Sequence, residues 1–281
     1  MNRYSDLSAW RAARRGLEGS VGFVPTMGAL HRGHASLIER SVAECEHTVL
    51  SVYVNPTQFN NPQDLEHYPR TLEADLAMAS ELGVDSVLTP DYASLYPDDY
   101  RYRVDEDGLS ASLCGAHRPG HFSGVLTVVM KLLNLVRPSR AYFGEKDYQQ
   151  YLLIRDMCAA FLMDVEIVPC ATVRAPDGLA LSSRNALLDA DGRARAPEFA
   201  RLLRSSDTDD AVARRLEAAG FAVDYVETRA GRRFGAVVVR GGGREVRLID
   251  NVSVPFAASL SLEVVPVAHA TNASQPEART R

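Results

Sequence analysis

The sequence contains almost no lysine. Of its 31 basic residues only Lys131 and Lys146 are lysines, and the net charge is −5. A chain without a basic excess lacks the electrostatic signature of a nucleic-acid-binding protein. Where arginine is used nearly everywhere, a lysine can mark a position that needs a compact ammonium group. For Lys131 chance is the simpler interpretation, because the surrounding run 125–136 is apolar and predicts a buried helix.

Cysteine is scarce, and long apolar runs are missing. Cys45, Cys114, Cys158 and Cys170 show no C-x-x-C spacing, which argues against a disulfide scaffold and favours a reducing cytoplasm. The first residues lack the apolar segment of a signal peptide. No apolar run approaches the roughly 18 residues that span a bilayer. We therefore expect a cytoplasmic protein without a membrane segment.

Several well-known site motifs are absent. The sequence has no G-x-G-x-x-G, no G-x-x-x-x-G-K-[ST], no H-E-x-x-H and no G-x-S-x-G, which weakens the case for a dinucleotide-binding protein, a P-loop NTPase, a zinc protease or a serine hydrolase. His117 and His121 have the spacing of a metal pair on a helix. Pro119 and Gly120 lie between them and would break that helix, so we do not expect a metal there.

What is present is an alternation of strand and helix patterns. Runs typical of buried strands are residues 21–24, 48–54, 85–88, 141–143 and 165–168. Segments with helical spacing are residues 35–45, 72–82, 122–136 and 148–161. Strands that alternate with helices predict βαβ units and a parallel sheet. The first domain is therefore expected to be an α/β domain over residues 1–174.

The pattern changes after residue 174. Helical segments at 189–204 and 209–219 precede strand-like runs at 222–228, 235–239 and 245–250. This order predicts a smaller α+β domain over residues 175–267. The polar residues 268–281 are expected to form a disordered tail.

Three chemically rich loops follow three of the predicted strands. PTMGALHRGH (residues 25–34) follows the first, NPTQF (55–59) the second, and GEKD (144–147) the strand at 141–143. In a parallel sheet, ligands bind beyond the carboxyl ends of the strands. These loops should therefore meet at one edge of the sheet and form a site.

His31 and His34 lie where a strand gives way to a helix. They could be ordinary loop histidines. However, a helix N-terminus favours anions, and imidazoles there can donate hydrogen bonds to phosphate oxygens in a transition state. The stretch GLALSSRN (178–185) has two hydroxyls and a guanidinium that could clamp a triphosphate. On its own, such a stretch is more often a helix cap. Together with an H-x-G-H motif on a parallel sheet, it becomes a specific indicator of a nucleotide site.

These two motifs resemble the HIGH and KMSKS elements of the nucleotidyltransferase superfamily, on a Rossmann-like sheet domain. Seven blocks in order are similar to one family within it, the pantoate–β-alanine ligases (pantothenate synthetases). They are PTMGALHRGH, VNPTQF, HYPRT, RPGHFSGVLTVVMKLLNLVRP, FGEKDYQQ, RAPDGLALSSRN and RLIDNV.

The resemblance implies a two-step, AMP-forming carbon–nitrogen ligation. Pantoate would react with ATP to give pantoyl adenylate and pyrophosphate, and β-alanine would then attack the acyl carbon to give pantothenate and AMP. Such chemistry needs positioning and charge stabilisation more than an acid or base. The resemblance also implies Mg²⁺ accompanying ATP, with ligands that cannot be assigned, a small domain that acts as a lid, and a homodimer. It implies no nucleic-acid or membrane partner.

Residue by residue, the resemblance assigns the following positions. ATP would be bound by Met27, Gly28, Ala29, Leu30, His31, Arg32, Gly33 and His34, by Gly144, Glu145, Lys146 and Asp147, by Val173, and by Leu181, Ser182, Ser183 and Arg184. Pantoate would be bound by Gln58 and Gln150, with β-alanine also at Gln58. The catalytic residues would be His34, His31 and Lys146, and further pocket candidates are Asn55, Tyr68 and Arg118.

The region between Asn185 and Arg247 matches the family poorly and looks short. Two alternatives therefore stay open. One is another nucleotidyltransferase that transfers a nucleotide to a substrate phosphate. The other is a ligand-binding homologue whose lid and turnover are impaired.

Overall fold

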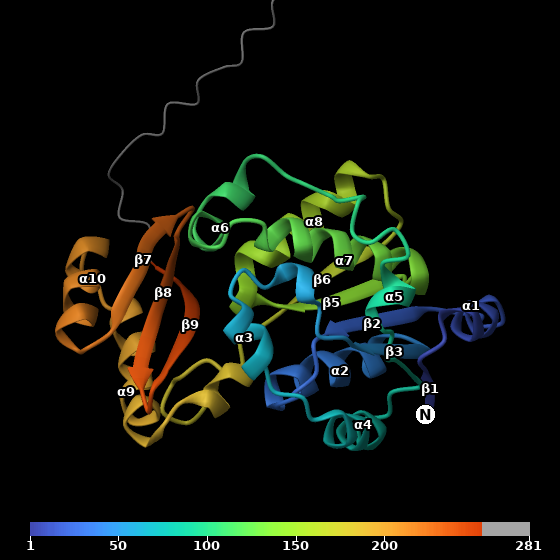
Figure 1. Cartoon of the computed structure of the whole chain (residues 1–281), viewed down its shortest axis with the longest axis horizontal. Coiled ribbons are helices and arrows are strands. Elements are labelled where there is room, and N and C mark those ends of the chain that lie inside the picture. The colour runs from blue at the N-terminus through green and yellow to red at the C-terminus, as the bar shows by residue number, and fades with distance from the viewer. Residues whose placement is uncertain (255–281) are drawn as a thin grey trace, which may run out of the picture.

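The computed structural model describes residues 1–254, as two packed units (Figure 1). The larger unit contains a parallel sheet between helices, and the smaller one an antiparallel sheet with two helices. The predicted tail at 268–281 and the end of the predicted small domain lie outside the described residues. The boundary at residue 174 stays a prediction.

The large unit is built on six parallel strands in the order β1-β4-β3-β2-β5-β6. Their bounds are β1 Asn2–Tyr4, β2 Val21–Thr26, β3 His47–Val52, β4 Ser86–Leu88, β5 Arg140–Gly144 and β6 Glu166–Cys170. The parallel sheet predicted from the strand and helix alternation is thereby confirmed, and every strand predicted before residue 174 is present.

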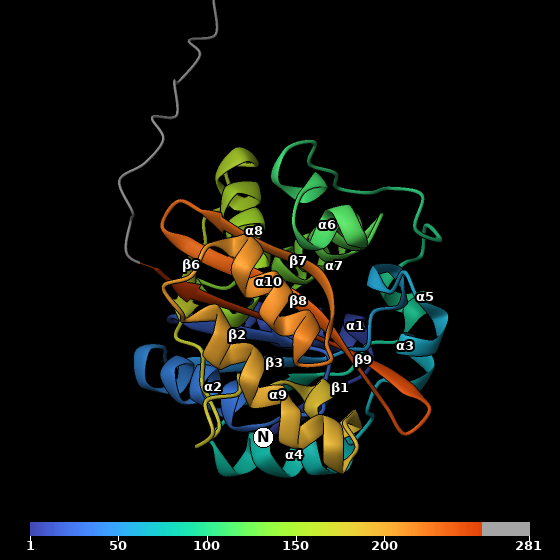
Figure 2. The same cartoon turned by 90° about the vertical axis from the view of Figure 1, so that its left-hand side faces the viewer.

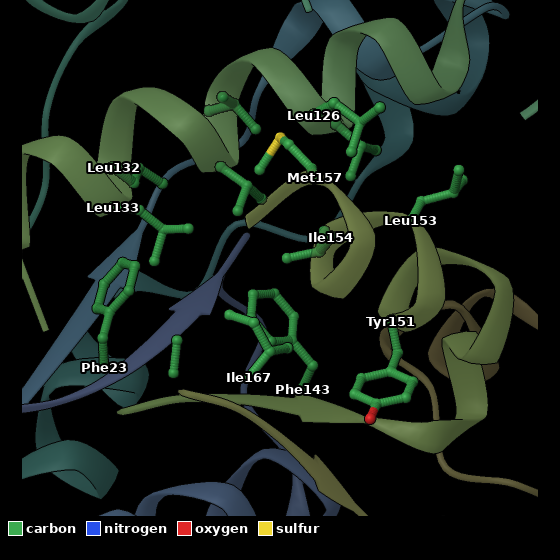
Figure 3. Packing of buried hydrophobic residues seen from close by; sticks show 14 of the residues in the cluster. Phe23, Leu126, Leu132, Leu133, Phe143, Tyr151, Leu153, Ile154, Met157 and Ile167 are labelled. Carbon is green, nitrogen blue, oxygen red and sulfur yellow. The ribbon is translucent and has the colours of Figure 1, made fainter. Parts of the chain in front are cut away.

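Helices cover both faces of this sheet. They are α1 Leu7–Arg15, α2 Arg32–Glu44, α4 Leu72–Glu81, α7 His121–Val136 and α8 Tyr148–Ala160, with the short α3 Pro62–His67, α5 Tyr92–Leu95 and α6 Cys114–His117. On one face, side chains of α7 and α8 pack on β2 and β5 (Figure 3), and side chains of α1 belong to the same core. Leu126 of α7, Ile154 of α8 and Phe23 of β2 are almost completely buried in it. Helices α2 and α4 pack on the opposite face.

The small unit consists of α9 Ala190–Leu203, α10 Asp209–Ala218 and the strands β7 Ala222–Arg229, β8 Arg232–Gly241 and β9 Arg244–Ser253. The strands form an antiparallel meander, as the α+β pattern predicts. Phe199, Leu216 and Val237 are buried in its core. In Figure 2 this unit lies in front of the large sheet. Tyr225 and Phe234 join the core of the large unit, so the two units are in direct contact.

Candidate active site

A cavity of about 230 Å³ lies at the carboxyl ends of β2, β3 and β5, where the three predicted loops meet. The predicted residues that line it are Met27, His31, Gly33, His34, Gln58, Gly144, Lys146, Asp147, Gln150, Val173, Leu181, Ser182, Ser183 and Arg184, with Asn55, Tyr68 and Arg118. The predicted residues that do not line it are Gly28, Ala29, Leu30, Arg32 and Glu145.

His31 and His34 close the N-terminus of α2 with their own ring nitrogens. The backbone N–H of Gly33 donates to Nδ1 of His31 at 3.1 Å, and the N–H of His31 donates to Nδ1 of His34 at 3.3 Å. Because each Nδ1 accepts a hydrogen bond, the proton of each neutral ring sits on Nε2. The helix cap therefore leaves both histidines with an Nε2–H donor for a ligand, next to the positive end of the helix dipole.

Both rings are held in the neutral form. Burial, together with the nearby charge of Lys146, lowers the pKa of His31 to about 4. Burial, followed by the proximity of His31 and then of Lys146, lowers the pKa of His34 to about 3. The two rings stack with their centroids 4.1 Å apart. At neutral pH the site thus offers two uncharged donors close to the cation Lys146.

The loop between β2 and α2 is held in place from behind by Asp75 of α4. Gly28 and Ala29 both have positive φ angles, 79° and 50°, a conformation that costs energy at a residue with a side chain. The buried carboxylate of Asp75 accepts the N–H groups of Ala29 at 2.9 Å and Leu30 at 2.8 Å. Its contacts stabilise the turn that leads to His31.

Lys146 lies opposite the histidines, in the short 3-10 helix η3 Glu145–Asp147 that follows β5. Its Nζ is 3.6 Å from Oδ1 of Asp147. The small unit fixes this segment, because Nδ2 of Asn251 in β9 donates to the carbonyls of Glu145 at 2.9 Å and Lys146 at 2.8 Å. The other lysine, Lys131, lies outside the cavity and pairs with Asp98 at 2.8 Å.

The predicted phosphate clamp reaches the same cavity. Ser183, in the 3-10 helix η4 Ser183–Leu187, donates from Oγ to the carbonyl of Ala29 at 3.0 Å and so ties the clamp to the loop before His31. Arg184 makes a two-point pair with Asp64, with Nη2 2.7 Å from Oδ2 and Nε 3.1 Å from Oδ1. Its guanidinium also lies over the ring of Tyr68. These contacts anchor the clamp to two separate segments of the large unit.

Gln58 is oriented by Asn55, which is 1% exposed. Nδ2 of Asn55 donates to Oε1 of Gln58 at 3.0 Å, which leaves the amide N–H groups of Gln58 as donors for a ligand. Gln150, in the first turn of α8, lines the same cavity. The apolar lining residues nearby on α7 are Val125, Val128, Val129 and Leu132. This part of the cavity suits a small molecule with both polar and methyl groups.

Behind Gln58, His121 and Arg118 hold its backbone. The carbonyl of Gln58 accepts from Nδ1 of His121 at 2.8 Å and from Nη2 of Arg118 at 3.3 Å. Helix α6 ends at His117 and α7 begins at His121, so the predicted helix break is confirmed. Within residues 1–254, no three His, Cys, Asp or Glu side chains cluster as metal ligands.

A second, outer hollow of about 630 Å³ separates the two units and continues from the cavity. The residues that border both are Arg118, Lys146, Asp147, Ser182 and Arg184. Small molecules can therefore approach the inner cavity from the space between the two units.

Four residues of the site were not predicted from sequence: Asp64, Asp75, His121 and Asn251. His121 and Asn251 fall inside blocks of the family resemblance, and Asp64 lies between two of them, so the sequence indicated the neighbourhood of these three residues. Asp75 and Asn251 act on backbone groups of distant segments. No local sequence pattern identifies the backbone groups that they contact.

The structure also bears on the predictions about cysteines and membrane segments. The four cysteines are free thiols, and three of them are buried. Among residues 1–254, the helices include none with both the length and the apolar character needed to cross a bilayer.

Comparisons with known proteins agree on one family. The family model described as pantoate-β-alanine ligase matches residues 1–253. A pantothenate synthetase from Bdellovibrio bacteriovorus is 54% identical over 250 residues, which cover 89% of this chain and 97% of the relative. One from Legionella pneumophila is 50% identical over 253 residues, covering 89% of this chain and 99% of the relative. The family match therefore includes the region between Asn185 and Arg247, where the sequence blocks were few.

Solved structures show the same similarity. Pantoate-β-alanine ligase from Francisella tularensis, complexed with beta-gamma ATP and β-alanine, matches with a TM-score of 0.85 at 38% identity, covering 90% of this chain and 97% of that chain. Pantothenate synthetase from Thermus thermophilus matches with a TM-score of 0.80 at 43% identity, covering 91% of this chain and 100% of that chain.

Proposed function

The chain belongs to the pantoate–β-alanine ligase family, and from this membership we infer that its cavity joins pantoate and β-alanine to pantothenate with the consumption of ATP. The observation that carries this inference is the pair of neutral Nε2–H donors at the start of α2, with Lys146 and the clamp residues Ser182 and Arg184 on the same cavity. The alternatives of another nucleotidyltransferase or an inactive homologue are not favoured.

In the first step, a carboxylate oxygen of pantoate attacks the α-phosphorus of ATP and the bond to pyrophosphate breaks. Negative charge shifts onto the phosphate oxygens as this happens. We assign His34 and His31 as neutral donors to these oxygens and Lys146 as the cation that offsets the charge, because fixed donors in a cavity act without reorganising. Ser182, Ser183 and Arg184 would hold the departing pyrophosphate.

In the second step, the amine of β-alanine attacks the acyl carbon of pantoyl adenylate, AMP leaves, and the amine loses a proton. The mixed anhydride must be sheltered from water until then. We propose that the small domain serves as the lid, supported by the contact of Asn251 with the backbone of Lys146.

Pantoate has two methyl groups, two hydroxyls and a carboxylate. We propose that Gln58 and Gln150 bind its polar groups, while Val125, Val129 and Leu132 contact the methyl groups. The two neutral amides can hydrogen-bond to the hydroxyls and the carboxylate without placing a charge of their own on the group that has to react.

The remaining assignments concern the nucleotide. We propose that Met27 to His34 and Gly144 to Asp147 surround ATP, with Val173 next to the adenine. The carbonyl of Val173 accepts from the N–H of Leu181 at 3.0 Å, so this wall is tied to the clamp. Gly28, Ala29, Leu30, Arg32 and Glu145 would act through the backbone, since they do not line the cavity.

We propose that Mg²⁺ accompanies ATP and neutralises part of the triphosphate charge. The described residues contain no cluster of three acidic or imidazole ligands. This fits an ion held mainly by phosphate oxygens and water, as Mg²⁺ commonly is. A homodimer and a cytoplasmic location are proposed from the family resemblance, and the four free cysteines suit a reducing compartment.

The activity is tested by measuring AMP with ATP, pantoate and β-alanine supplied together or singly. We expect AMP at a substantial rate only when both organic substrates are present. AMP formation that ignores pantoate or β-alanine would contradict the ligase assignment. Transfer of the AMP group from ATP to a phosphorylated acceptor, with release of pyrophosphate and no free AMP, would favour another nucleotidyltransferase.

A further inference from the structure

Four partly buried cations border the outer hollow between the two units: Lys146, Arg184, Arg247 and Arg118. Three of them have a carboxylate partner: Lys146 lies 3.6 Å from Asp147, Arg184 lies 2.7 Å from Asp64, and Arg247 lies 2.7 Å from Asp224. Within residues 1–254, Arg118 forms no such ion pair. It is a partly buried charge in need of an anion.

The contacts of Arg118 are all with neutral groups. Nε donates to Oδ1 of Asn60 at 3.2 Å, Nη2 to the carbonyl of Gln58 at 3.3 Å, and Nη1 lies 3.0 Å from Nε2 of His121. Since Nδ1 of His121 donates to the carbonyl of Gln58, its Nε2 is free to accept from Arg118. A guanidinium has five N–H donors. These three contacts leave one N–H on each terminal nitrogen, the pair that a carboxylate can accept.

The charges around Arg118 also favour an anion. Burial, then the proximity of Arg184 and Arg247, lowers the pKa of Arg118 to about 10. The group remains charged at neutral pH, where it is repelled by two other guanidiniums. An anion placed here would relieve that repulsion.

The position of Arg118 indicates which anion. It borders both the inner cavity and the outer hollow, and it supports the backbone of Gln58. We propose that Arg118 is the subsite for the carboxylate of β-alanine, and that it selects amine substrates with a terminal acid. This inference rests on the proposed function.

Two other anions fit the position less well. The pantoate carboxylate must reach the α-phosphate beside His31 and His34. His31 and His34 border only the inner cavity, whereas Arg118 lies where that cavity meets the outer hollow. Pyrophosphate has its own partners in Lys146, Ser182 and Arg184. β-Alanine is the remaining anion, and its two methylene groups would let the amine extend from the mouth at Arg118 toward the acyl carbon.

The test separates the two half-reactions in Arg118→Met. Pantoate-dependent exchange of labelled pyrophosphate into ATP reports adenylation alone, and AMP formation gives KM for β-alanine. We expect KM for β-alanine to rise about 30-fold or more, as for loss of a charged hydrogen-bonded pair. Exchange measured at saturating ATP and pantoate should stay within about threefold of wild type, because the carbonyl of Gln58 keeps its hydrogen bond from Nδ1 of His121. The preference for β-alanine over propylamine, which lacks the carboxylate, should fall by the same factor.

Arg244→Met is the matched control, because Arg244 is exposed on the rim of the same hollow; it should behave as wild type. Arg118→Lys keeps the positive charge but loses the two parallel N–H donors of the guanidinium. We therefore expect an intermediate rise of about tenfold in KM for β-alanine. This variant decides the question if Arg118→Met does not fold.

Three results would overturn the subsite. The first is a fall in pyrophosphate exchange that parallels the fall in overall rate. The second is a change in KM for ATP, or in inhibition by pyrophosphate, with no change in KM for β-alanine. The third is an unaltered preference for β-alanine over propylamine. Failure of the wild-type protein to form AMP from the three substrates would instead contradict the proposed function.

Discussion

His31 and His34 use the two nitrogens of their rings for different purposes. The Nδ1 atoms accept backbone N–H groups at the start of α2, and this fixes the proton on Nε2. A helix cap usually comes from serine, threonine, aspartate or asparagine. Histidine at this position caps the helix and still offers a donor on the far side of the ring. That combination explains why the two histidines occur together in this turn.

His34→Ala should slow pantoate-dependent pyrophosphate exchange by about a hundredfold, the usual loss for one transition-state donor. The alanine variant also loses the acceptor for the N–H of His31, so it should be less stable by about 1 kcal/mol. His34→Asn has a short side chain that can still accept that N–H. It should be as slow as His34→Ala but closer to wild type in stability.

Urea unfolding and the exchange assay together separate these two effects. His47→Ala is the control, because His47 begins β3 at the opposite edge of the sheet. Near-normal exchange in His34→Asn would contradict the donor assignment and leave His34 as a capping residue.

Among the elements, α4 has a role that its sequence does not reveal. The segment 72–82 was predicted as a helix from its spacing, and α4 forms at Leu72–Glu81. Its buried Asp75, however, accepts the N–H groups of Ala29 and Leu30, 45 residues or more away in the chain. Helical spacing reports which face is apolar; it does not report which distant backbone group an acid on that face accepts.

Asp75→Asn should weaken the turn before His31. The amide keeps the size of the carboxylate but replaces one acceptor oxygen by a donor, so one buried N–H loses its partner. We expect the free energy of unfolding to fall by about 1–3 kcal/mol, and KM for ATP to rise because the loop carrying His31 shifts. Glu73→Gln, on the exposed side of α4, should change neither quantity. Unaltered stability in Asp75→Asn would exclude this supporting role.

The elements that sequence missed were those with little local signal. The edge strand β1 has only three residues, Asn2–Tyr4. Its parallel pairing with Ser86–Leu88 depends on the tertiary structure and not on a local sequence pattern. Helix α1 at Leu7–Arg15 contacts the core through Leu7 and Trp10, and Asp6 caps it by accepting from Ser8 and Ala9. Only two of its nine residues, Leu7 and Trp10, are buried, so the helix is short and its apolar face is small, whereas the long apolar run of α7 was recognised directly.

At the scale of the whole molecule, the site depends on both units. The sequence indicated the loops that carry the chemistry, because each follows a strand of a predictable parallel sheet. It did not indicate the contacts of Asn251 with the backbone of Glu145 and Lys146, or the pairing of Arg184 with Asp64. These contacts join segments about a hundred residues apart, and only the folded arrangement of the two units brings them together.

Acid stability is a further whole-molecule property, because the site buries three neutral histidines. The pKa values of His31, His34 and His121 are lowered to about 4, 3 and 3, in each case mainly by burial. In the unfolded chain these rings titrate near pH 6.5. Between pH 6.5 and about 4 the unfolded chain therefore binds more protons than the folded one, and the stability present above pH 6.5 is lost as the pH falls.

The free energy of unfolding, measured by urea titration at pH 7.5, 6, 5 and 4.5, should fall by about 1.4 kcal/mol per pH unit for each histidine kept neutral by the fold. His34→Asn removes one of the three, so its stability should fall less steeply with pH. A wild-type stability that stays constant from pH 6.5 to 4.5 would mean that the buried rings take up protons in the folded state, and the assignment of two neutral donors to the active site would have to be abandoned.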